Sequence, residues 1–203
     1  EILLMLRLRP LLFLLLAVLV APPALAQNTV FDFESEVNGQ AGPFVYLDQG
    51  VTTTISADAP PPGNHLGVAI FDSSFGGPND FGGPNSDQDL VIGSGNILIL
   101  QNNNFPTQTV PGIFDTANDD EMGGVFFFDF DNPVYMNSID LIDINGGGNL
   151  SVTMRDSATG TRTYTVPDDW TGDILDGYQG WQTLDLTTLL PQVGVGLGNP
   201  VAT

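Results

Sequence analysis

Apolar and polar residues alternate along much of the chain, and this period of two is typical of β-strands. Residues 30–34 place two phenylalanines on one face and two carboxylates on the other. Residues 125–130 place Phe126, Phe128 and Phe130 on one face, and residues 150–154 alternate in the same way. Successive side chains of a strand point to opposite faces, so these segments predict strands.

Further strands are predicted where short apolar or β-branched runs are bounded by glycine, asparagine, aspartate or proline. These runs are residues 51–55, 67–71, 96–100, 139–144 and 162–166. No segment after residue 26 has sustained helical periodicity, although 187–190 could form one turn. The pattern predicts an all-β fold, an antiparallel β-sandwich or barrel.

The connections contain strong turn signals. Residues 59–64 form a proline-rich corner that ends a strand, and the glycine-rich residues 145–149 suit the turn of a hairpin. The hexapeptide at 75–80 is repeated almost unchanged at 81–86. This repeat is a local duplication within one loop and does not indicate a repeat architecture.

The N-terminal residues have the three parts of a secretory signal peptide. Two arginines follow Met5, residues 11–20 are almost continuously apolar, and residues 24–26 read Ala-Leu-Ala. An apolar run of this length is short for a membrane span, and small residues at these positions suit cleavage. We expect a signal peptide over residues 1–26, with translation starting at Met5.

The remaining residues, 27–203, have the length of one domain. The final residues, 198–203, do not form an obvious closing strand. A β-sandwich usually needs its last strand to cover an edge, so we expect the sequence to be truncated at its C-terminus.

The chain is strongly acidic, with 24 acidic residues, 4 basic residues and a net charge of −20. The predicted leader contains Glu1, Arg7 and Arg9, which leaves 23 acidic and 2 basic residues in the mature chain. Such a surface repels nucleic acid and anionic membranes and attracts cations. The chain has no cysteine, so an exported domain of this sequence must be stabilised by its core or by bound metal.

A succession of motifs resembles a known type of bacterial secreted domain. The motifs are residues 31–34, 68–73 and 96–99, then Asp120 with Gly123 and Gly124, then 126–130 and 138–144. Together they are similar to the β-sandwich ectodomains of surface proteins sorted by PEP-CTERM-type or other interchangeable C-terminal anchors. The resemblance covers most of residues 30–155. It implies a jelly-roll-like sandwich that is exported by a Gram-negative bacterium and acts at the cell surface or in the matrix.

Two features depart from this resemblance. The loop after residues 68–73 carries the duplicated hexapeptide, and this departure argues against carrying the family's ligands over to the loop. The sequence also contains no Pro-Glu-Pro tail with an apolar helix and a terminal basic cluster. We therefore expect contact with a membrane only through an anchor beyond the C-terminus of this sequence.

Residues suited to catalysis are few. His65 is the only histidine and follows the proline corner, where a solvated loop histidine is the simplest interpretation. One histidine without cysteine cannot form a usual zinc site. Carboxylates for a glycosidase are plentiful but lie in no recognisable motif, so we expect no enzymatic activity.

Calcium is the better-supported chemistry, because Ca²⁺ binds carboxylate, amide and backbone carbonyl oxygens in glycine-rich acidic loops. For Glu34, the resemblance suggests the structural Ca²⁺ site that jelly-roll sandwiches commonly have near the N-terminus. The alternative is a solvated acidic surface. The candidate ligands form three groups: Glu34, Glu36 and Asp72; Asp80, Asp87 and Asp89; and Asp119 and Asp120.

Three aromatic residues lie among carboxylates and amides near the C-terminus: Trp170, Tyr178 and Trp181. Aromatic rings can stack on sugars while polar neighbours bind the hydroxyls. A tryptophan in such a loop can equally cover the end of a sandwich core.

The sequence therefore predicts a secreted, non-catalytic cell-surface or matrix domain that Ca²⁺ stabilises. An extracellular polysaccharide or the surface matrix is the expected partner, and nucleic acid is not. The first alternative is a carbohydrate-binding module, and the second is a secreted hydrolase with an acidic cleft.

Overall fold

The computed structural model describes residues 29–58, 65–79, 88–120, 122–144, 150–156, 160–172 and 174–187. The chain divides into one unit of residues 1–30 and a second of residues 31–203. Only Thr29 and Val30 of the first unit are described, so the fold below is that of the second unit. The predicted leader, proline corner and glycine-rich turn lie outside the described residues.

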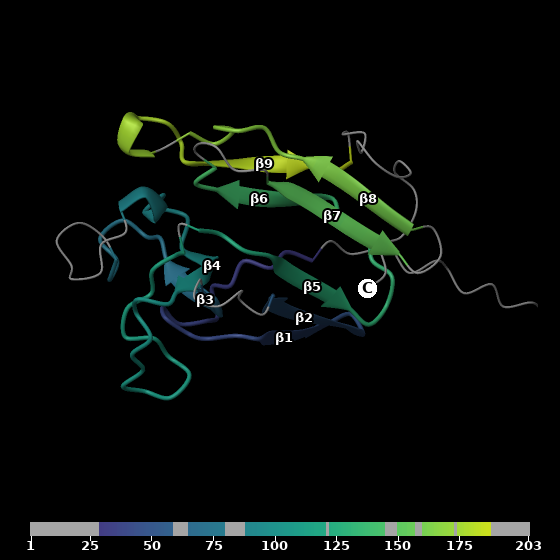
Figure 1. Cartoon of the computed structure of the whole chain (residues 1–203). Coiled ribbons are helices and arrows are strands. Elements are labelled where there is room, and N and C mark those ends of the chain that lie inside the picture. Colours follow the sequence, from purple (N-terminus) through teal and green to yellow (C-terminus); the bar gives the residue numbers. More distant parts are fainter. Residues whose placement is uncertain are drawn as a thin grey trace, which may run out of the picture. The chain divides into compact units, whose positions relative to one another are not determined.

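The described residues form an all-β fold of nine strands and two short 3₁₀ turns (Figure 1). The strands are β1 Phe44–Asp48, β2 Val51–Ala57, β3 His65–Asp72, β4 Asn96–Asn102, β5 Phe126–Phe130, β6 Ser138–Ile142, β7 Ser151–Asp156, β8 Gly160–Thr165 and β9 Trp181–Asp185. The 3₁₀ turns are η1 Gln88–Leu90 and η2 Ile174–Asp176. Within this part of the chain, no helix is long and apolar enough to span a membrane.

The strands pair in four antiparallel sheets. One sheet has the order β1-β2-β5, and three two-stranded sheets pair β3 with β4, β6 with β9, and β7 with β8. The predicted all-β antiparallel class is confirmed. The jelly-roll arrangement stays a prediction.

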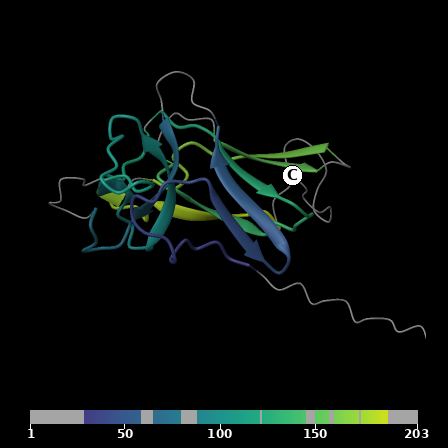
Figure 2. The same ribbon diagram turned by 90° about the horizontal axis from the view of Figure 1, so that it is seen from below.

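Figure 2 draws the β1-β2-β5 sheet as a ribbon, and the register of its strands gives the sheet one apolar face, as the alternation predicts. Ile55 of β2 lies opposite Phe44 on one side and Phe128 on the other. Alternate residues of a strand share a face, so Phe126 and Phe130 of β5 lie on the same face as Phe128. This face contributes to a core, here called the N-terminal core, of Phe44, Ile55, Val68, Ile70 and Leu100.

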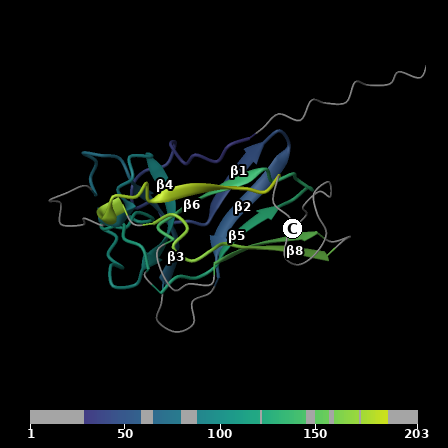
Figure 3. The ribbon, with the colours of Figure 1, turned by 90° about the horizontal axis from the view of Figure 1, so that it is seen from above.

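The β3–β4 ribbon, whose two strands are labelled in Figure 3, contributes side chains to one core on each face. Val68, Ile70 and Leu100 belong to the N-terminal core on one face. The opposite face contributes to a second core, the loop core, of Ala69, Phe71, Leu90, Val91, Ile97, Ile99, Phe114 and Ala117. This double burial explains why the two strands are continuously apolar in sequence instead of alternating.

The last four strands share a third core, the C-terminal core. It consists of Met154, Tyr164, Val166, Leu184 and Leu186, which come from β7, β8, β9 and the residues that follow β8 and β9. Ile139 and Leu141 of β6 pack against it. Ile142, at the end of β6, instead packs against the loop core.

The predicted strand at residues 30–34 is wrong, because the chain turns there. Phe33 has a φ of 58°, and its carbonyl accepts a hydrogen bond from Glu36 N at 3.0 Å. The predicted alternation nevertheless holds for its phenylalanines, because the rings of Phe31 and Phe33 both contact Tyr46. The Asn96 side chain of β4 donates to Phe33 O, a backbone carbonyl that a neighbouring strand would otherwise have bound.

Two strands were not predicted, and one predicted pairing is wrong. β1 coincides with an apolar run at residues 44–47 that lacks period-two alternation, and β9 has no apolar run of this length. The glycine-rich residues 145–149 suggest a hairpin of β6 with β7, yet β6 pairs with β9 and β7 pairs with β8.

We predict that Tyr164→Phe does not destabilise the protein. The Tyr164 side chain is 2% exposed, and its hydroxyl has no hydrogen-bond partner among the described residues. A buried hydroxyl without a partner is costly, so its removal should raise the free energy of unfolding by about 1 kcal/mol, or Tm by about 2–4 °C. Thermal unfolding of the two proteins measures this difference.

Tyr46→Phe is the matched control, because the Tyr46 hydroxyl donates to Glu36 Oε1 at 3.2 Å. It should lower Tm. A larger loss of Tm in Tyr164→Phe than in Tyr46→Phe would contradict the prediction.

Candidate functional site

The first predicted group of metal ligands lies where the N-terminal segment meets the end of the β3–β4 ribbon. Asp72 and Asn96 are opposed at this end of the ribbon. Glu34 Oε1 accepts a hydrogen bond from Asn96 N at 3.0 Å. The Asn96 amide Nδ2 donates to two backbone carbonyls, Phe33 O at 3.1 Å and Glu36 O at 2.8 Å. Asn96 therefore fixes the turn of residues 33–36 against β4.

Gly95 makes the approach of Glu34 possible. Its φ is +80°, and a Cβ atom built on it would lie 2.1 Å from Glu34 Oε1. Any larger residue would displace the carboxylate from Asn96 N. The Glu34 carboxylate thus has a defined structural role at this position.

Glu36 contacts β1 and a neighbouring glutamine. Glu36 Oε1 accepts the Tyr46 hydroxyl, and Glu36 Oε2 accepts Gln40 Nε2 at 2.5 Å. Partial burial, followed by the negative charge of Glu36, raises the pKa of Tyr46. The phenol therefore stays protonated and donates to the carboxylate.

Asp72 belongs to a buried polar network. Its Oδ1 accepts Ser74 N at 2.9 Å, and its backbone N donates to Asn38 Oδ1 at 3.0 Å. Asn79 is fully buried and donates from Nδ2 to Asn38 Oδ1 at 2.8 Å and to Asp72 O at 3.0 Å. Asn79 is the asparagine of the first copy of the duplicated hexapeptide, so this copy is anchored to β3.

The carboxylates of this group are thus bound by protein donors. Among the described residues, no group of three or more His, Asp or Glu side chains is placed to hold a metal ion. Asp80 and Asp87, from the second predicted group, lie outside these residues, and Asp89 lies within η1. Calcium binding remains a prediction.

The third predicted group, Asp119 and Asp120, lies beside β4. Asp119 forms an isolated antiparallel bridge with Gln101, and Asn102 N donates to Asn118 O at 2.8 Å. Asp120 is 8% exposed, and its Oδ1 accepts Met122 N at 2.9 Å. Sequence reasoning found these two carboxylates but missed the residue that orders their loop, Gln101.

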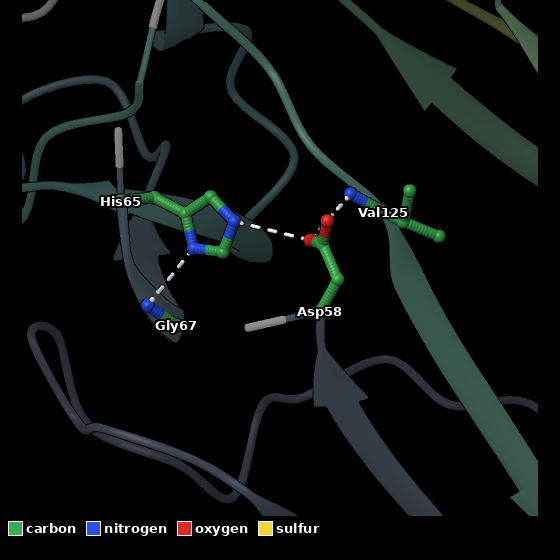
Figure 4. Close-up of polar contacts among 4 residues, drawn as sticks. All are labelled: Asp58, His65, Gly67 and Val125. Carbon is green, nitrogen blue, oxygen red and sulfur yellow. Dashed lines mark hydrogen bonds and ion pairs between the residues drawn. The ribbon is translucent and has the colours of Figure 1, made fainter. Parts of the chain in front are cut away.

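His65, at the opposite end of the ribbon from Asp72, is buried. The expectation of a solvated loop histidine is wrong, because the side chain is only 2% exposed. His65 Nε2 lies 3.1 Å from Asp58 Oδ1, which also accepts Val125 N at 3.0 Å (Figure 4). A Cβ atom on Gly124 would lie 2.8 Å from His65 Nε2, so only glycine fits there without displacement. The pair links residues that follow β2, begin β3 and precede β5.

Both ring nitrogens of His65 are engaged. Gly67 N donates to Nδ1 at 3.1 Å, so Nδ1 carries a lone pair and the proton is on Nε2, which donates to Asp58. This arrangement holds a neutral imidazole and leaves neither nitrogen to accept a proton from a nucleophile. The hydrogen bonds of His65 and Asp58 therefore connect the residue after β2, the start of β3 and the residue before β5.

The three predicted aromatic ligands lie in different environments. Trp170 is partly buried against the C-terminal core. Trp181 lies opposite Ile142 on the face of the β6–β9 sheet that does not carry Leu184. Tyr178 is 64% exposed, and its ring lies over Gly172, where an added Cβ would be 2.5 Å from Tyr178 Cγ. Of the three, Tyr178 offers the most accessible ring.

A comparison of the chain with protein families, with curated proteins and with solved structures found no match. The candidate site residues are therefore assigned from the geometry described above.

We predict different effects for Trp170→Ala and Tyr178→Ala. Trp170 packs on a core, so its truncation should lower the free energy of unfolding by about 2–4 kcal/mol. Tyr178 is mostly exposed, and its truncation should cost less than about 0.5 kcal/mol. Urea denaturation measures both values, and equal losses would contradict the assignment of Trp170 to the core.

We also predict that Asp58→Asn destabilises the protein at neutral pH and that this effect diminishes as the pH falls below about 4. The hydrogen bond from Val125 N, and then that from His65, lowers the pKa of Asp58 below its usual 3.8. A lowered folded-state pKa contributes stability above the unfolded-state pKa, and this contribution is lost as pH falls through the folded-state value. The side chain is 29% exposed, so the expected loss near pH 7 is only about 1 kcal/mol.

Thermal unfolding of both proteins between pH 7 and pH 3 tests this. The two Tm curves should converge as pH falls. Asp140→Asn is a control for removing one carboxylate elsewhere, because Asp140 is an exposed residue of β6 whose carboxylate accepts a hydrogen bond from the Thr183 hydroxyl. A Tm difference between Asp58→Asn and the wild type that grows towards pH 3 would contradict the predicted direction of this pH dependence.

Proposed function

We propose that the protein is a non-catalytic extracellular domain that acts at the cell surface or in the surrounding matrix and is stabilised by Ca²⁺. The observation that carries this proposal is that the buried polar side chains form hydrogen bonds that hold the fold. His65 uses both ring nitrogens to hold the fold, and Asn79 and Gln101 are fully buried in backbone contacts. Such groups position strands and loops instead of binding a substrate.

The charge balance supports the role of cations. The chain has 24 acidic and 4 basic residues, and Arg162 is buried at 5% exposure. Few positive groups are therefore available to neutralise the surface. Repulsion among carboxylates destabilises a compact state, and bound Ca²⁺ relieves it at the sites where oxygens gather.

The extracellular setting is supported by the leader-like residues 1–26. The resemblance of residues 30–155 to ectodomains of anchored surface proteins points to the same setting. The all-β fold agrees with this resemblance. An extracellular polysaccharide or a component of the surface matrix is the partner that this proposal implies.

A carbohydrate-binding module is a second candidate, and the exposed ring of Tyr178 favours it. Sugar faces stack on accessible aromatic rings. Binding on a glycan array that Tyr178→Ala abolishes would support this candidate, and an array without signal would leave the structural role.

We predict that Ca²⁺ raises the melting temperature. At about ten times its Kd, a ligand that binds only the folded state stabilises it by about 1.4 kcal/mol, or about 3–6 °C for a chain of this size. The expected Kd is about 0.1–1 mM, as for other extracellular modules. Differential scanning calorimetry with Ca²⁺, with Mg²⁺ and with chelator, all at equal ionic strength, measures the effect.

The control for general screening of charge is Mg²⁺, which demands a smaller octahedral site. Equal melting in Ca²⁺ and in chelator would contradict the calcium part of the proposal. An equal rise in Ca²⁺ and Mg²⁺ would show screening without a specific site.

A further inference from the structure

The strands β1, β2 and β5 lie side by side (Figure 1), and the face of their sheet away from the N-terminal core carries exposed side chains. Successive side chains of a strand point to opposite faces, so the residues between the core positions share this face. We call it the outer face, and it consists of Val45, Leu47, Thr52, Thr54, Ser56, Phe127 and Asp129. Its apolar members Val45, Leu47 and Phe127 are 64%, 75% and 41% exposed. Exposed apolar side chains among polar ones are typical of an interaction site.

A row of hydroxyls runs along the centre of the outer face. Thr52, Thr54 and Ser56 are half-buried residues of the central strand β2. Thr52 is held at one end, because its backbone N donates to Asp131 Oδ1 at 2.9 Å. The hydroxyls of Thr54 and Ser56 form no hydrogen bond with another described residue. A hydroxyl both donates and accepts, so these two can bind the hydroxyls of a ligand in either direction.

The edge strand β5 places an aromatic ring and a carboxylate beside this row. Phe127 lies directly opposite Ser56, and Asp129 lies directly opposite Thr54. The Cβ atoms of directly opposed residues are about 5 Å apart, so one ligand can contact both members of each pair. An aromatic ring stacks on the C–H face of a sugar, while hydroxyls and a carboxylate bind sugar hydroxyls. The outer face therefore combines the groups that recognise a carbohydrate.

The charge of the outer face favours a neutral ligand. Asp129 is its only ionisable residue, in a chain with a net charge of −20. An anionic polymer would meet only negative charge on this face. A second copy of the chain would bring a further net charge of −20 and would cover the central hydroxyls without supplying partners. A neutral polymer rich in hydroxyls meets neither obstacle.

We propose that the outer face binds a neutral polysaccharide, with Phe127 as the stacking ring and with Thr54, Ser56 and Asp129 as hydrogen-bonding groups. This inference rests on the proposed function, because it locates the surface for the polysaccharide that the function implies as a partner. Three strands about 4.8 Å apart form a surface about 10 Å wide, on which an extended sugar chain can lie. The site is separate in sequence from the Tyr178 loop, so substitutions distinguish the two.

The first experiment is affinity electrophoresis in native gels that contain hydroxyethylcellulose, galactomannan, dextran or the anionic polymer alginate. We expect at least one neutral polymer to retard the wild type and alginate not to retard it. Phe127→Ala removes the stacking ring and should raise Kd for that neutral polymer about tenfold. Phe127→Tyr keeps the ring and should bind within about twofold of the wild type.

The second experiment removes a hydroxyl without changing the shape of the side chain. Thr54→Val should raise Kd about two- to tenfold, because one hydrogen bond to the sugar is lost. The matched control is Thr161→Val, which removes an exposed hydroxyl from β8 and should leave Kd unchanged. Both variants keep a β-branched residue in a strand, so this comparison remains decisive if Phe127→Ala does not fold. Equal weakening by the two variants would overturn the site.

The outcomes separate this inference from the proposed function. A wild type that none of the three neutral polymers retards overturns the inference, whereas the proposed calcium stabilisation depends on the calorimetric response alone. Retardation that Tyr178→Ala abolishes and Phe127→Ala retains overturns the outer face and supports the carbohydrate site in the C-terminal loop. Retardation by alginate overturns the neutral class. Dimerisation in analytical ultracentrifugation that Leu47→Ser abolishes would show that a second copy covers the face, and it would also overturn the inference.

Discussion

The β3–β4 ribbon is buried on both faces, and this burial imposes a requirement on the residues at its two ends. Val68 and Ile70 face the N-terminal core, while Ala69 and Phe71 face the loop core. A ribbon covered on both sides cannot solvate the polar groups where its pairing stops, so the protein must supply their partners. Most of the polar contacts described above supply those partners.

Each end of the ribbon meets this requirement with side chains distant in sequence. At one end, Asn96 binds the turn of residues 33–36, and Asn38 binds Asp72 N. At the other, His65 binds Asp58, and Gln101 holds the loop of residues 116–118. Buried amides and a neutral imidazole suit this purpose because they donate and accept at once without carrying a charge into the core.

The sequence predicts the strand class well, because period two and bounded apolar runs are local signals. It does not predict that β6 pairs with β9, because this choice depends on which faces the C-terminal core brings together. The predicted strands also omit β1, although residues 44–47 are an apolar run between Pro43 and Asp48. This run shows no period-two pattern, because the exposed Val45 and Leu47 alternate with the inward Phe44 and Tyr46. Residues 30–34 show the reverse error. Their alternation predicts a strand, but the chain turns there, and the Asn96 side chain binds Phe33 O in place of a neighbouring strand.

The same distinction applies to the candidate site. Residue type alone identifies carboxylates, but it cannot separate those that bind protein donors from those that do not. The carboxylates of Glu34 and Asp72 accept hydrogen bonds from Asn96 N and Ser74 N, and those contacts depend on the tertiary fold. Asp120 differs because its Oδ2 is buried and has no hydrogen-bond partner among the described residues. In a chain this acidic, the tertiary fold therefore decides which carboxylate oxygens have a protein donor.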